Sequence, residues 1–289
     1  MTEALAFFPG FRAVRETIDG VAIHAVVGGE GPPLLMLHGA PQSCLMWRKI
    51  APALAQRFTV VCADLRGYGW SDKPAASKPD DYSKRRMAAD QVGLMRALGF
   101  DRFRLVGHDR GARVSRRLAK DHPDTVEKLA LLDIAPTAYI YANTTREVAD
   151  NMWHWFFFTR PAPGPEALMG PQAERFVRGS QRLADNDPVV ADAIARTNGN
   201  PEAFHAMCSD YRAGASIDLE HDAADAATPI ICPTLIAWGR ESRSTGALFD
   251  VYDAWRGELQ DARFAMLECG HFLAEERPAE TLALLTDFL

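Results

Sequence analysis

The stretch from Leu105 to Arg113, Leu-Val-Gly-His-Asp-Arg-Gly-Ala-Arg, contains the residue with the most distinctive chemistry. An apolar run, a Gly-x-Asp-x-Gly turn and a helical pattern are typical of a nucleophile elbow, which lifts one side chain above the end of a sheet. That side chain is Asp109, where the common form of the motif carries serine. A carboxylate that attacked an ester would form an unproductive anhydride, whereas attack on saturated carbon forms an alkyl ester that water can open. The motif therefore predicts displacement of a leaving group such as halide, or opening of an epoxide.

Hydrolysis of that ester needs a base to activate water and an acid to orient the base. His271 is the candidate base, because its Gly-His-Phe loop follows the last predicted strand, where folds with such an elbow place their histidine. Two carboxylates could orient it, Asp133 at the end of an apolar run and Glu241 after the next predicted strand. Asp133 is favoured because a half-buried carboxylate needs a partner, whereas Glu241 in its charged loop can be solvated.

Arg110 and Arg113 lie three residues apart in the first turn of the predicted helix, so both can face the same way. Positive charge near a helix N-terminus is unfavourable by about 0.3–1 kcal/mol per residue if uncompensated. Anions should therefore balance these arginines, and Asp109 supplies one. A bidentate carboxylate on the substrate would supply another. The same positive charges are expected to lower the pKa of Asp109 and keep it ionised.

Hydrogen-bond donors are predicted on two sides of the nucleophile. The backbone N–H groups of Ala40, in a turn after an early strand, and of Arg110 could hold the charge that forms when water attacks the ester carbonyl. A departing halide also needs donors. His154 and Trp155 carry N–H groups within an aromatic segment, and Tyr211 carries an O–H in a neighbouring one. These three side chains are the candidate halide pocket.

Short apolar runs between helical patterns must position these residues, and they predict a mostly parallel sheet. The predicted strands span 11–18, 21–27, 33–37, 58–63, 103–106, 129–132, 234–238 and 263–267, with helices over 82–98 and 278–289. The recurrence of strand-length apolar runs stops between about Pro136 and Pro229. We interpret 136–228 as a helical cap over the strand ends, where open α/β sheets bind ligands, and 1–135 with 229–289 as the core domain. A second core domain in the middle of the chain is the alternative.

Composition narrows the classes of function. A net charge of −6 argues against nucleic-acid or anionic-membrane partners. No apolar stretch approaches the roughly 18 residues of a membrane span, and the first residues lack a signal-peptide pattern. The cysteines form no metal-binding spacing, so no metal is expected, and their odd, scattered set suits a reducing cytoplasm; they are Cys44, Cys62, Cys208, Cys232 and Cys269.

The segments around these candidates resemble the fluoroacetate dehalogenases, within the haloalkane dehalogenase and epoxide hydrolase branch of the α/β-hydrolase fold. The resemblance runs from about Phe11 to the C-terminus. Its motifs are His38–Arg48, Asp64–Pro74, Gly107–Val114, Leu132–Thr137, Trp153–Phe156, Tyr211–Ala215 and Gly270–Leu273. The Asp64 and Gly270 segments occur across the wider superfamily, so the paired arginines, the Trp-His-Trp segment and Tyr211 are the specific part.

The resemblance implies an α/β-hydrolase fold with an eight-stranded, mostly parallel sheet, helices on both faces and an inserted helical cap. It implies hydrolysis of a haloacetate such as fluoroacetate or chloroacetate to glycolate and halide, through a covalent aspartyl ester and without a cofactor. By position it assigns the nucleophile, base and acid to Asp109, His271 and Asp133. It also implies the arginine clamp for a small-molecule haloacid and the halide pocket described above, and it suggests a homodimer.

One residue departs from the family pattern. Ala40 stands where this family is expected to carry a bulky aromatic residue. The backbone N–H of Ala40 keeps its role, but the pocket should be wider than one shaped for fluoroacetate. Chloroacetate, bromoacetate and larger 2-haloacids therefore remain open as substrates.

Two other functions compete with this interpretation. An epoxide hydrolase would share the nucleophile, acid and base, but it needs tyrosine hydroxyls to protonate the opening oxygen, which Tyr211 with Tyr139 or Tyr141 could supply. The arginine pair argues against an epoxide hydrolase unless its epoxide is acidic. A non-catalytic ligand receptor on the same fold is the other alternative, and the intact nucleophile, acid and base argue against it.

Overall fold

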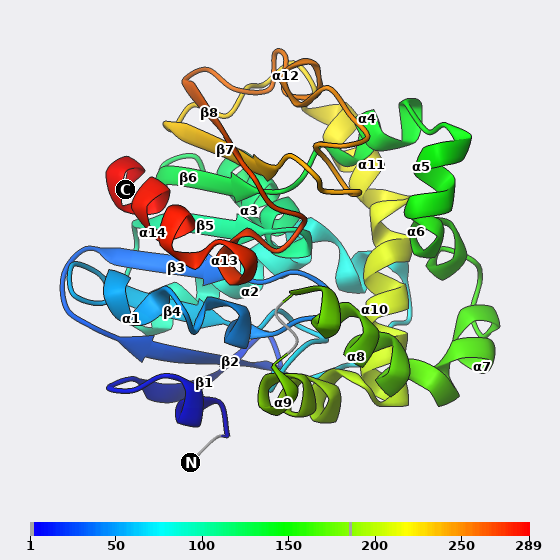
Figure 1. The fold of residues 1–289 in the computed structure, drawn as a ribbon, viewed down its shortest axis with the longest axis horizontal. Helices are drawn as coiled ribbons and strands as arrows, with labels where there is room; N and C mark the ends of the chain where they lie inside the picture. The colour runs from blue at the N-terminus through cyan, green and yellow to red at the C-terminus, as the bar shows by residue number, and fades with distance from the viewer. Residues whose placement is uncertain (1–2, 185–186) are drawn as a thin grey trace.

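Eight apolar runs of the chain pair into one sheet, in the order β1-β2-β4-β3-β5-β6-β7-β8 (Figure 1). The computed structural model describes residues 3–184 and 187–289. Each predicted strand overlaps one observed strand; these are β1 (Arg12–Ile18), β2 (Val21–Gly28), β3 (Pro33–Leu37), β4 (Thr59–Ala63), β5 (Phe103–His108), β6 (Val126–Leu132), β7 (Thr234–Gly239) and β8 (Ala262–Leu267).

The sheet is antiparallel only at its β1 end. Strands β1 and β2 form a hairpin whose turn residues Asp19 and Gly20 have φ values of 46° and 81°, as the tight turn between two right-twisted strands requires. Strand β2 also pairs antiparallel with β4, and the remaining neighbours all pair parallel. The predicted mostly parallel, eight-stranded sheet is therefore confirmed. In such a sheet the carboxyl ends of β5, β6 and β8, which precede Asp109, Asp133 and His271, lie at one edge.

Alternate side chains of the strands enter two separate cores, one on each face of the sheet. In β3, Leu35 and Leu37 belong to the core that α2 (Lys84–Ala97) and α3 (Arg110–Asp121) cover. Leu34 and Met36 belong to the opposite core, which is covered by α1 (Ala51–Leu54), α13 (Leu273–Glu276) and α14 (Pro278–Phe288). Helices therefore pack on both faces, as the family resemblance implies, and the short α12 (Val251–Ala254) joins the first core.

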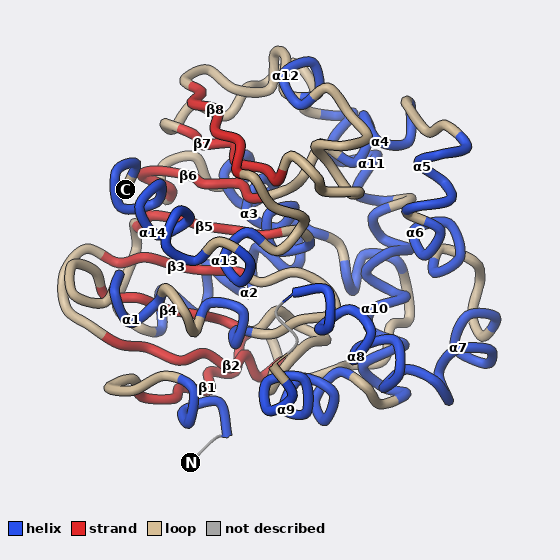
Figure 2. Tube along the Cα trace, viewed as in Figure 1, coloured by secondary structure: helices blue, strands red, loops and turns tan. Residues whose placement is uncertain are grey.

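Only helices and loops are found in the described residues between β6 and β7. Figures 1 and 2 show these helices gathered beside one end of the strands. Two of them meet at 198–201, where Asn200 caps the following helix and Pro201 opens it. They are α4 (Thr137–Ala142), α5 (Arg146–Asn151), α6 (Trp153–Phe158), α7 (Gly164–Met169), α8 (Ala173–Ala184), α9 (Pro188–Asn198), α10 (Pro201–Gly214) and α11 (Ile217–Ala224).

Short 3-10 helices complete the described structure, namely η1 (Glu3–Phe7), η2 (Cys44–Trp47), η3 (Pro79–Tyr82) and η4 (Gly170–Gln172). Within the described ranges, every helix is too short or too polar to cross a membrane.

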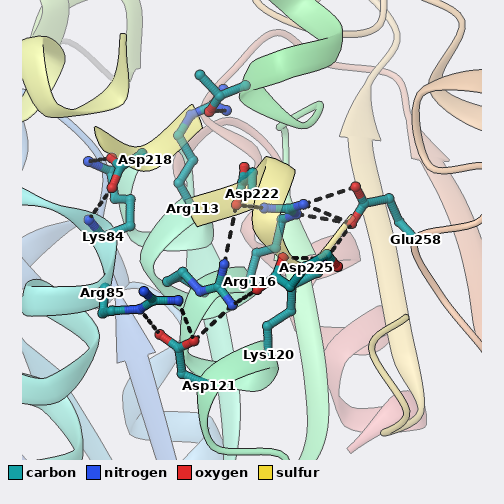
Figure 3. Close-up of polar contacts among 12 residues, drawn as sticks. Lys84, Arg85, Arg113, Arg116, Lys120, Asp121, Asp218, Asp222, Asp225 and Glu258 are labelled. Atoms are coloured by element: carbon teal, nitrogen blue, oxygen red, sulfur yellow. Dashed lines mark hydrogen bonds and ion pairs between the residues drawn. The ribbon is translucent and has the colours of Figure 1, made fainter. Parts of the chain in front are cut away.

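A cluster of ion pairs fastens α3 to α11 and to the loop before β8 (Figure 3). Arg116 bridges Asp222 of α11 and Glu258, each at 2.8 Å. Lys120 pairs with Asp225 at 3.2 Å. Because the basic side chains are buried, these pairs are screened less by salt than pairs on an open surface. The cluster joins the helices between β6 and β7 to the helix that follows Asp109.

Candidate active site

Asp109 lies at the sharp turn between β5 and α3, with φ 47° and ψ −116°. Such angles are strained for any residue with a side chain, at a cost of about 1–3 kcal/mol. The flanking glycines allow the strand and helix to approach each other. A Cβ on Gly107 would lie 2.4 Å from the hydroxyl of Ser115, and one on Gly111 would lie 2.4 Å from the carbonyl oxygen of His38. Strand, turn and helix thus occur where the Gly-x-Asp-x-Gly motif predicts them.

The carboxylate of Asp109 faces a backbone donor on one side and the histidine on the other. Its Oδ1 accepts a hydrogen bond of 2.9 Å from the N–H of Ala40. Its Oδ2 lies 3.9 Å from Nε2 of His271. The second predicted backbone donor, the N–H of Arg110, is at the N-terminus of α3, where the helix itself offers no acceptor. A charged oxygen bound to Cγ of Asp109 would therefore meet N–H groups from two different elements.

The pKa of Asp109 is lowered from its ordinary value. Burial alone would raise it, but the nearby charges of His271, His108, Arg110 and Arg113 outweigh burial. The carboxylate is therefore held ionised, as a nucleophile must be, and the direction matches the effect expected from the two arginines.

His271 is oriented by Asp133. The Nδ1 of His271 lies 2.6 Å from Oδ2 of Asp133, a buried residue at the end of β6. Asp133 also accepts hydrogen bonds from the N–H of Gly239, at 2.9 Å, and from the hydroxyl of Ser242. Burial would lower the pKa of His271, but the adjacent carboxylates, chiefly Asp133, raise it. Glu241, the alternative acid, is exposed at the rim of the cavity, and Asp133 is the carboxylate bonded to His271.

The two arginines of the first helical turn have different surroundings. Arg110 donates to both carboxylate oxygens of Asp210, at 2.9 and 2.6 Å, and to its backbone oxygen at 2.8 Å. Asp210 also accepts from Lys84 and from the hydroxyl of Tyr68. All these groups are buried, and the pKa of Asp210 is lowered because Arg110 and Lys84 outweigh the effect of burial. Arg110 is thus balanced by a carboxylate of α10 that lies far from it in the chain.

Arg113, in contrast, faces the cavity without a carboxylate bonded to it among the described residues. Its Nη1 donates to the backbone oxygen of Ala135, at 2.9 Å, and to the hydroxyl of Thr137, at 2.8 Å. Its Nε is buried and has no hydrogen-bond partner. In Figure 3 the side chain points away from the ion pairs of Arg116. Burial and the charge of Arg110 lower the pKa of Arg113 to about 10. An anion in the cavity would supply the partner that this guanidinium lacks.

The three candidate halide donors come together from α6 and α10. His154, Trp155 and Tyr211 all line the cavity, and the rings of His154 and Trp155 lie 5.7 and 5.8 Å from the ring of Tyr211. Burial lowers the pKa of His154 to about 4, so at neutral pH the ring is uncharged and one nitrogen carries a proton. Burial raises the pKa of Tyr211, so its hydroxyl stays protonated.

The cavity above Asp109 is large, with a volume of about 830 Å³. That volume falls in the range of sites for drug-sized ligands, far above the size of a haloacetate. Ala40 forms part of the wall, where an aromatic side chain would occupy space. Tyr139 and Tyr141, the further tyrosines considered for an epoxide hydrolase, are not among its described lining residues. The hydroxyl of Tyr139 donates to Asp253, and Tyr141 packs against Trp155.

One group of buried residues has the composition of a metal site but contacts of a structural kind. His24, Cys44 and Asp64 place their ligand atoms within 4.8 Å of one another. Both oxygens of Asp64 already accept hydrogen bonds, Oδ1 from the N–H of Cys44 and Oδ2 from the N–H of Trp70 beside the ring of His24. These bonds fasten two loops to β2, so the donor set carries no metal in our interpretation.

Several functional contacts were missed from sequence. His108 and Glu276 contact the backbone of the His271 loop, and Ser242 contacts Asp133. Asp210 accepts hydrogen bonds from both Arg110 and Lys84. Two of them had a usable signal, because His108 directly precedes the nucleophile and Asp210 directly precedes Tyr211. Ser242 and Lys84 are more than one hundred positions from the carboxylates they contact. Glu276 is close to its partners in the chain, but it bonds backbone N–H groups, which no residue type marks.

Comparison with known proteins gives consistent matches. The family model described as alpha/beta hydrolase fold matches residues 32–278. A fluoroacetate dehalogenase from Burkholderia sp is 45% identical, over 98% of this chain and 95% of its own. A soluble epoxide hydrolase from Corynebacterium sp. (strain C12) is 34% identical, over 90% and 91%. The crystal structure of a putative alpha/beta hydrolase from Nostoc sp PCC 7120 has a TM-score of 0.92 and 46% identity, and the match covers 98% of each chain.

Proposed function

The chain belongs to the α/β-hydrolase fold family, and we propose that it hydrolyses haloacetates or larger 2-haloacids to 2-hydroxy acids and halide. The observation that carries this proposal is the pair formed by an ionised carboxylate at the elbow and a buried cation, Arg113, to which no carboxylate of the described residues is bonded. A substrate that brings a carboxylate to Arg113 places its neighbouring carbon beside Asp109. The similarity to the Burkholderia fluoroacetate dehalogenase supports the same reaction class.

In the first step, an oxygen of Asp109 attacks the carbon that bears the halogen, forming a C–O bond as the carbon–halogen bond breaks. The halide leaves with the bonding electron pair toward the N–H and O–H groups of His154, Trp155 and Tyr211. The guanidinium of Arg113, whose Nε has no hydrogen-bond partner among the described residues, holds the substrate carboxylate, so that the carbon, the nucleophile and the leaving group are in line. Arg110 contributes charge close by, while its bonds to Asp210 fix its orientation.

In the second step, Nε2 of His271 removes a proton from water, and the hydroxide attacks Cγ of Asp109. The oxyanion is stabilised by the N–H groups of Ala40 and Arg110. The bond from Cγ to the alkyl oxygen then breaks, and the product hydroxyl takes the proton from His271. Asp133 stabilises the charged imidazole between these events. One oxygen of water remains in the carboxylate of Asp109.

We propose further that 136–228 act as a cap domain over a core of 1–135 and 229–289. This division is supported by the contribution of α6 and α10 to the cavity wall. We also expect a cytoplasmic homodimer, from the family resemblance, and sedimentation of the purified protein tests the oligomeric state.

Ion-selective detection of fluoride, chloride and bromide from matched haloacetates tests the proposal. The wild type should release halide with an equal amount of 2-hydroxy acid, and the Asp109→Asn variant should release none. A wild-type protein that is inert toward every haloacetate and 2-halopropionate would refute the proposed function.

Epoxide hydrolysis is the second candidate, supported by the Corynebacterium relative and by the hydroxyl of Tyr211 in the cavity. The bonds and packing of Tyr139 and Tyr141 weigh against it, because two tyrosines at the oxirane oxygen are then not available. Styrene oxide hydrolysis, measured beside halide release, separates the two functions.

A further inference from the structure

The backbone on either side of His271 is held by a carboxylate from the following helix. Glu276, the last residue of α13, accepts hydrogen bonds from the N–H of Gly270, at 2.7 Å, and from the N–H of Phe272, at 2.8 Å. The two bonds use different oxygens of one carboxylate, so Glu276 fixes the backbone on both sides of His271 in the chain. Bonds from N–H groups to a carboxylate are about twice as strong as those between neutral groups.

A second histidine contacts the same loop through its backbone oxygen. Nε2 of His108, at the end of β5, lies 2.7 Å from the backbone oxygen of His271, and the two rings are 4.6 Å apart. A carbonyl oxygen can only accept, so Nε2 carries the proton and the buried, unpartnered Nδ1 carries none. Burial and the neighbouring His271 lower the pKa of His108 to about 4, which keeps this neutral form at physiological pH.

We propose that Glu276 and His108 are positioning residues that hold the imidazole of His271 in place for hydrolysis of the ester at Asp109. The inference rests on the proposed function, because it assigns the two residues to the second of the two steps. Glu276 and His108 bond the backbone N–H and C=O groups of 270–272. Both residues would therefore influence the reaction through the position of His271 and not through contact with the substrate.

The two steps make different demands on His271. Formation of the ester uses the carboxylate of Asp109 in line with the carbon–halogen bond, together with the arginine and halide contacts, and it needs no proton transfer by His271. Hydrolysis needs Nε2 within about 2.6–3.2 Å of the attacking water. A displacement of about 1 Å can lower the rate of such a step on the order of a hundredfold. Loss of the hydrogen bonds from Glu276 or His108 to this loop should therefore slow hydrolysis of the ester and leave formation of the ester nearly unchanged.

The Glu276→Gln variant tests this assignment with little change in shape, because one of the two N–H donors then faces an amide group that cannot accept. Rapid-quench kinetics with chloroacetate would follow the initial release of chloride, and mass spectrometry of the quenched protein would follow the carboxymethyl ester. We expect the initial release to stay within about twofold of wild type, hydrolysis to fall about tenfold to hundredfold, and the ester to accumulate.

His108→Phe tests the link from the other side of the loop, since it keeps a ring against His271 and removes the donor. The matched control is Glu275→Gln in the same turn of α13. The carboxylate of Glu275 accepts hydrogen bonds from the side chains of Gln42 and Arg48. This control should lower the melting temperature without changing the ratio between the two steps.

A substrate-free measurement keeps this inference separate from the reaction itself. The proton on Nδ1 of His271, bonded to Asp133 at 2.6 Å, should give a low-field resonance in the proton NMR spectrum. The resonance should broaden or disappear in Glu276→Gln and His108→Phe but remain in Glu275→Gln. If wild type releases no halide from any haloacid, the proposed function fails, and an unchanged resonance in both variants overturns the positioning role independently. With an active wild type, equal slowing of both steps overturns it, as does an unchanged rate of hydrolysis.

Discussion

Arg110 and Arg113 lie one helical turn apart, yet we predict that their removal changes protein stability in opposite directions. Arg113→Met should leave the free energy of unfolding unchanged or slightly higher, while Arg110→Met should lower it strongly. Methionine is flexible enough to occupy most of either site without charge. The difference follows from the buried partner that each guanidinium has in the folded protein.

For Arg113, a pKa of about 10 instead of 12.5 corresponds to about 3 kcal/mol against the charged form in the fold. The pKa is lowered, so this cost is fully present at neutral pH and would disappear only as pH rises past the unfolded-state value. Its replacement by methionine removes that cost. It also removes two hydrogen bonds, to Ala135 and Thr137, worth about 1 kcal/mol each. The expected net change is a gain of about 1 kcal/mol.

For Arg110, replacement breaks a buried, bidentate pair and leaves Asp210 with Lys84 and Tyr68 as its remaining partners. Removal of one member of a buried ion pair costs about 3–5 kcal/mol. The folded state should therefore lose several kcal/mol, and its melting temperature should fall accordingly.

Urea denaturation of the two variants and the wild type would measure both changes, and kcat/KM for chloroacetate would measure their effect on activity. Arg113→Met should lower kcat/KM at least about a hundredfold, since two charge-assisted bonds to the substrate carboxylate are worth about 1.5–3 kcal/mol each. The reasoning would be refuted if Arg113→Met lost as much stability as Arg110→Met, because Arg113 would then have a compensating partner in the fold. Undiminished kcat/KM in Arg113→Met would remove it from substrate binding.

Three further outcomes are expected. In His271→Ala the ester at Asp109 should accumulate to about one per protein, because the base for its hydrolysis is missing. Mass spectrometry of the quenched enzyme would detect the ester, and turnover without its accumulation would exclude His271 as the base for the second step. The pKa of His271 is raised above 6.5, so this residue stays protonated to higher pH than a free histidine, and the rate of hydrolysis should rise with pH above 6.5. Asp133→Asn removes the main cause of the raised pKa and should move this rise to lower pH. A rise that does not move would belong to another group. Ala40→Phe should lower kcat/KM for 2-haloacids with large substituents at least about tenfold more than for chloroacetate, and an equal loss for both would place the substituent elsewhere in the cavity.

Much of the fold could be predicted because its buried strands are uninterrupted apolar runs. The start of β6 is an exception, since Glu127 and Lys128 break the apolar pattern although the strand begins at Val126. Their side chains are only half-buried, and they lie at a shift of register between Val126 and Leu129, which both pair with β5. Pairing between strands is a non-local interaction that an apolar pattern does not record.

The candidate site divides in the same way. Asp109, Asp133 and His271 each follow the end of a strand, so local sequence predicted that they meet at one edge of the sheet, while it left Glu241 open as the alternative acid. The partner of Arg110 was not predictable by that route, because Asp210 comes from a helix one hundred positions later (210 − 110). The bonds of Glu276 go to backbone N–H groups, which leave no mark on the identity of the residues they join.

A single turnover in water enriched in heavy oxygen, with enzyme in excess over chloroacetate, tests the covalent route most directly. After digestion, the peptide that contains Asp109 should carry one heavy oxygen in its side chain, and the glycolate formed in that turnover should carry none. Label in the glycolate and an unlabelled Asp109 would mean that water attacks the substrate directly, which contradicts nucleophilic attack by this carboxylate.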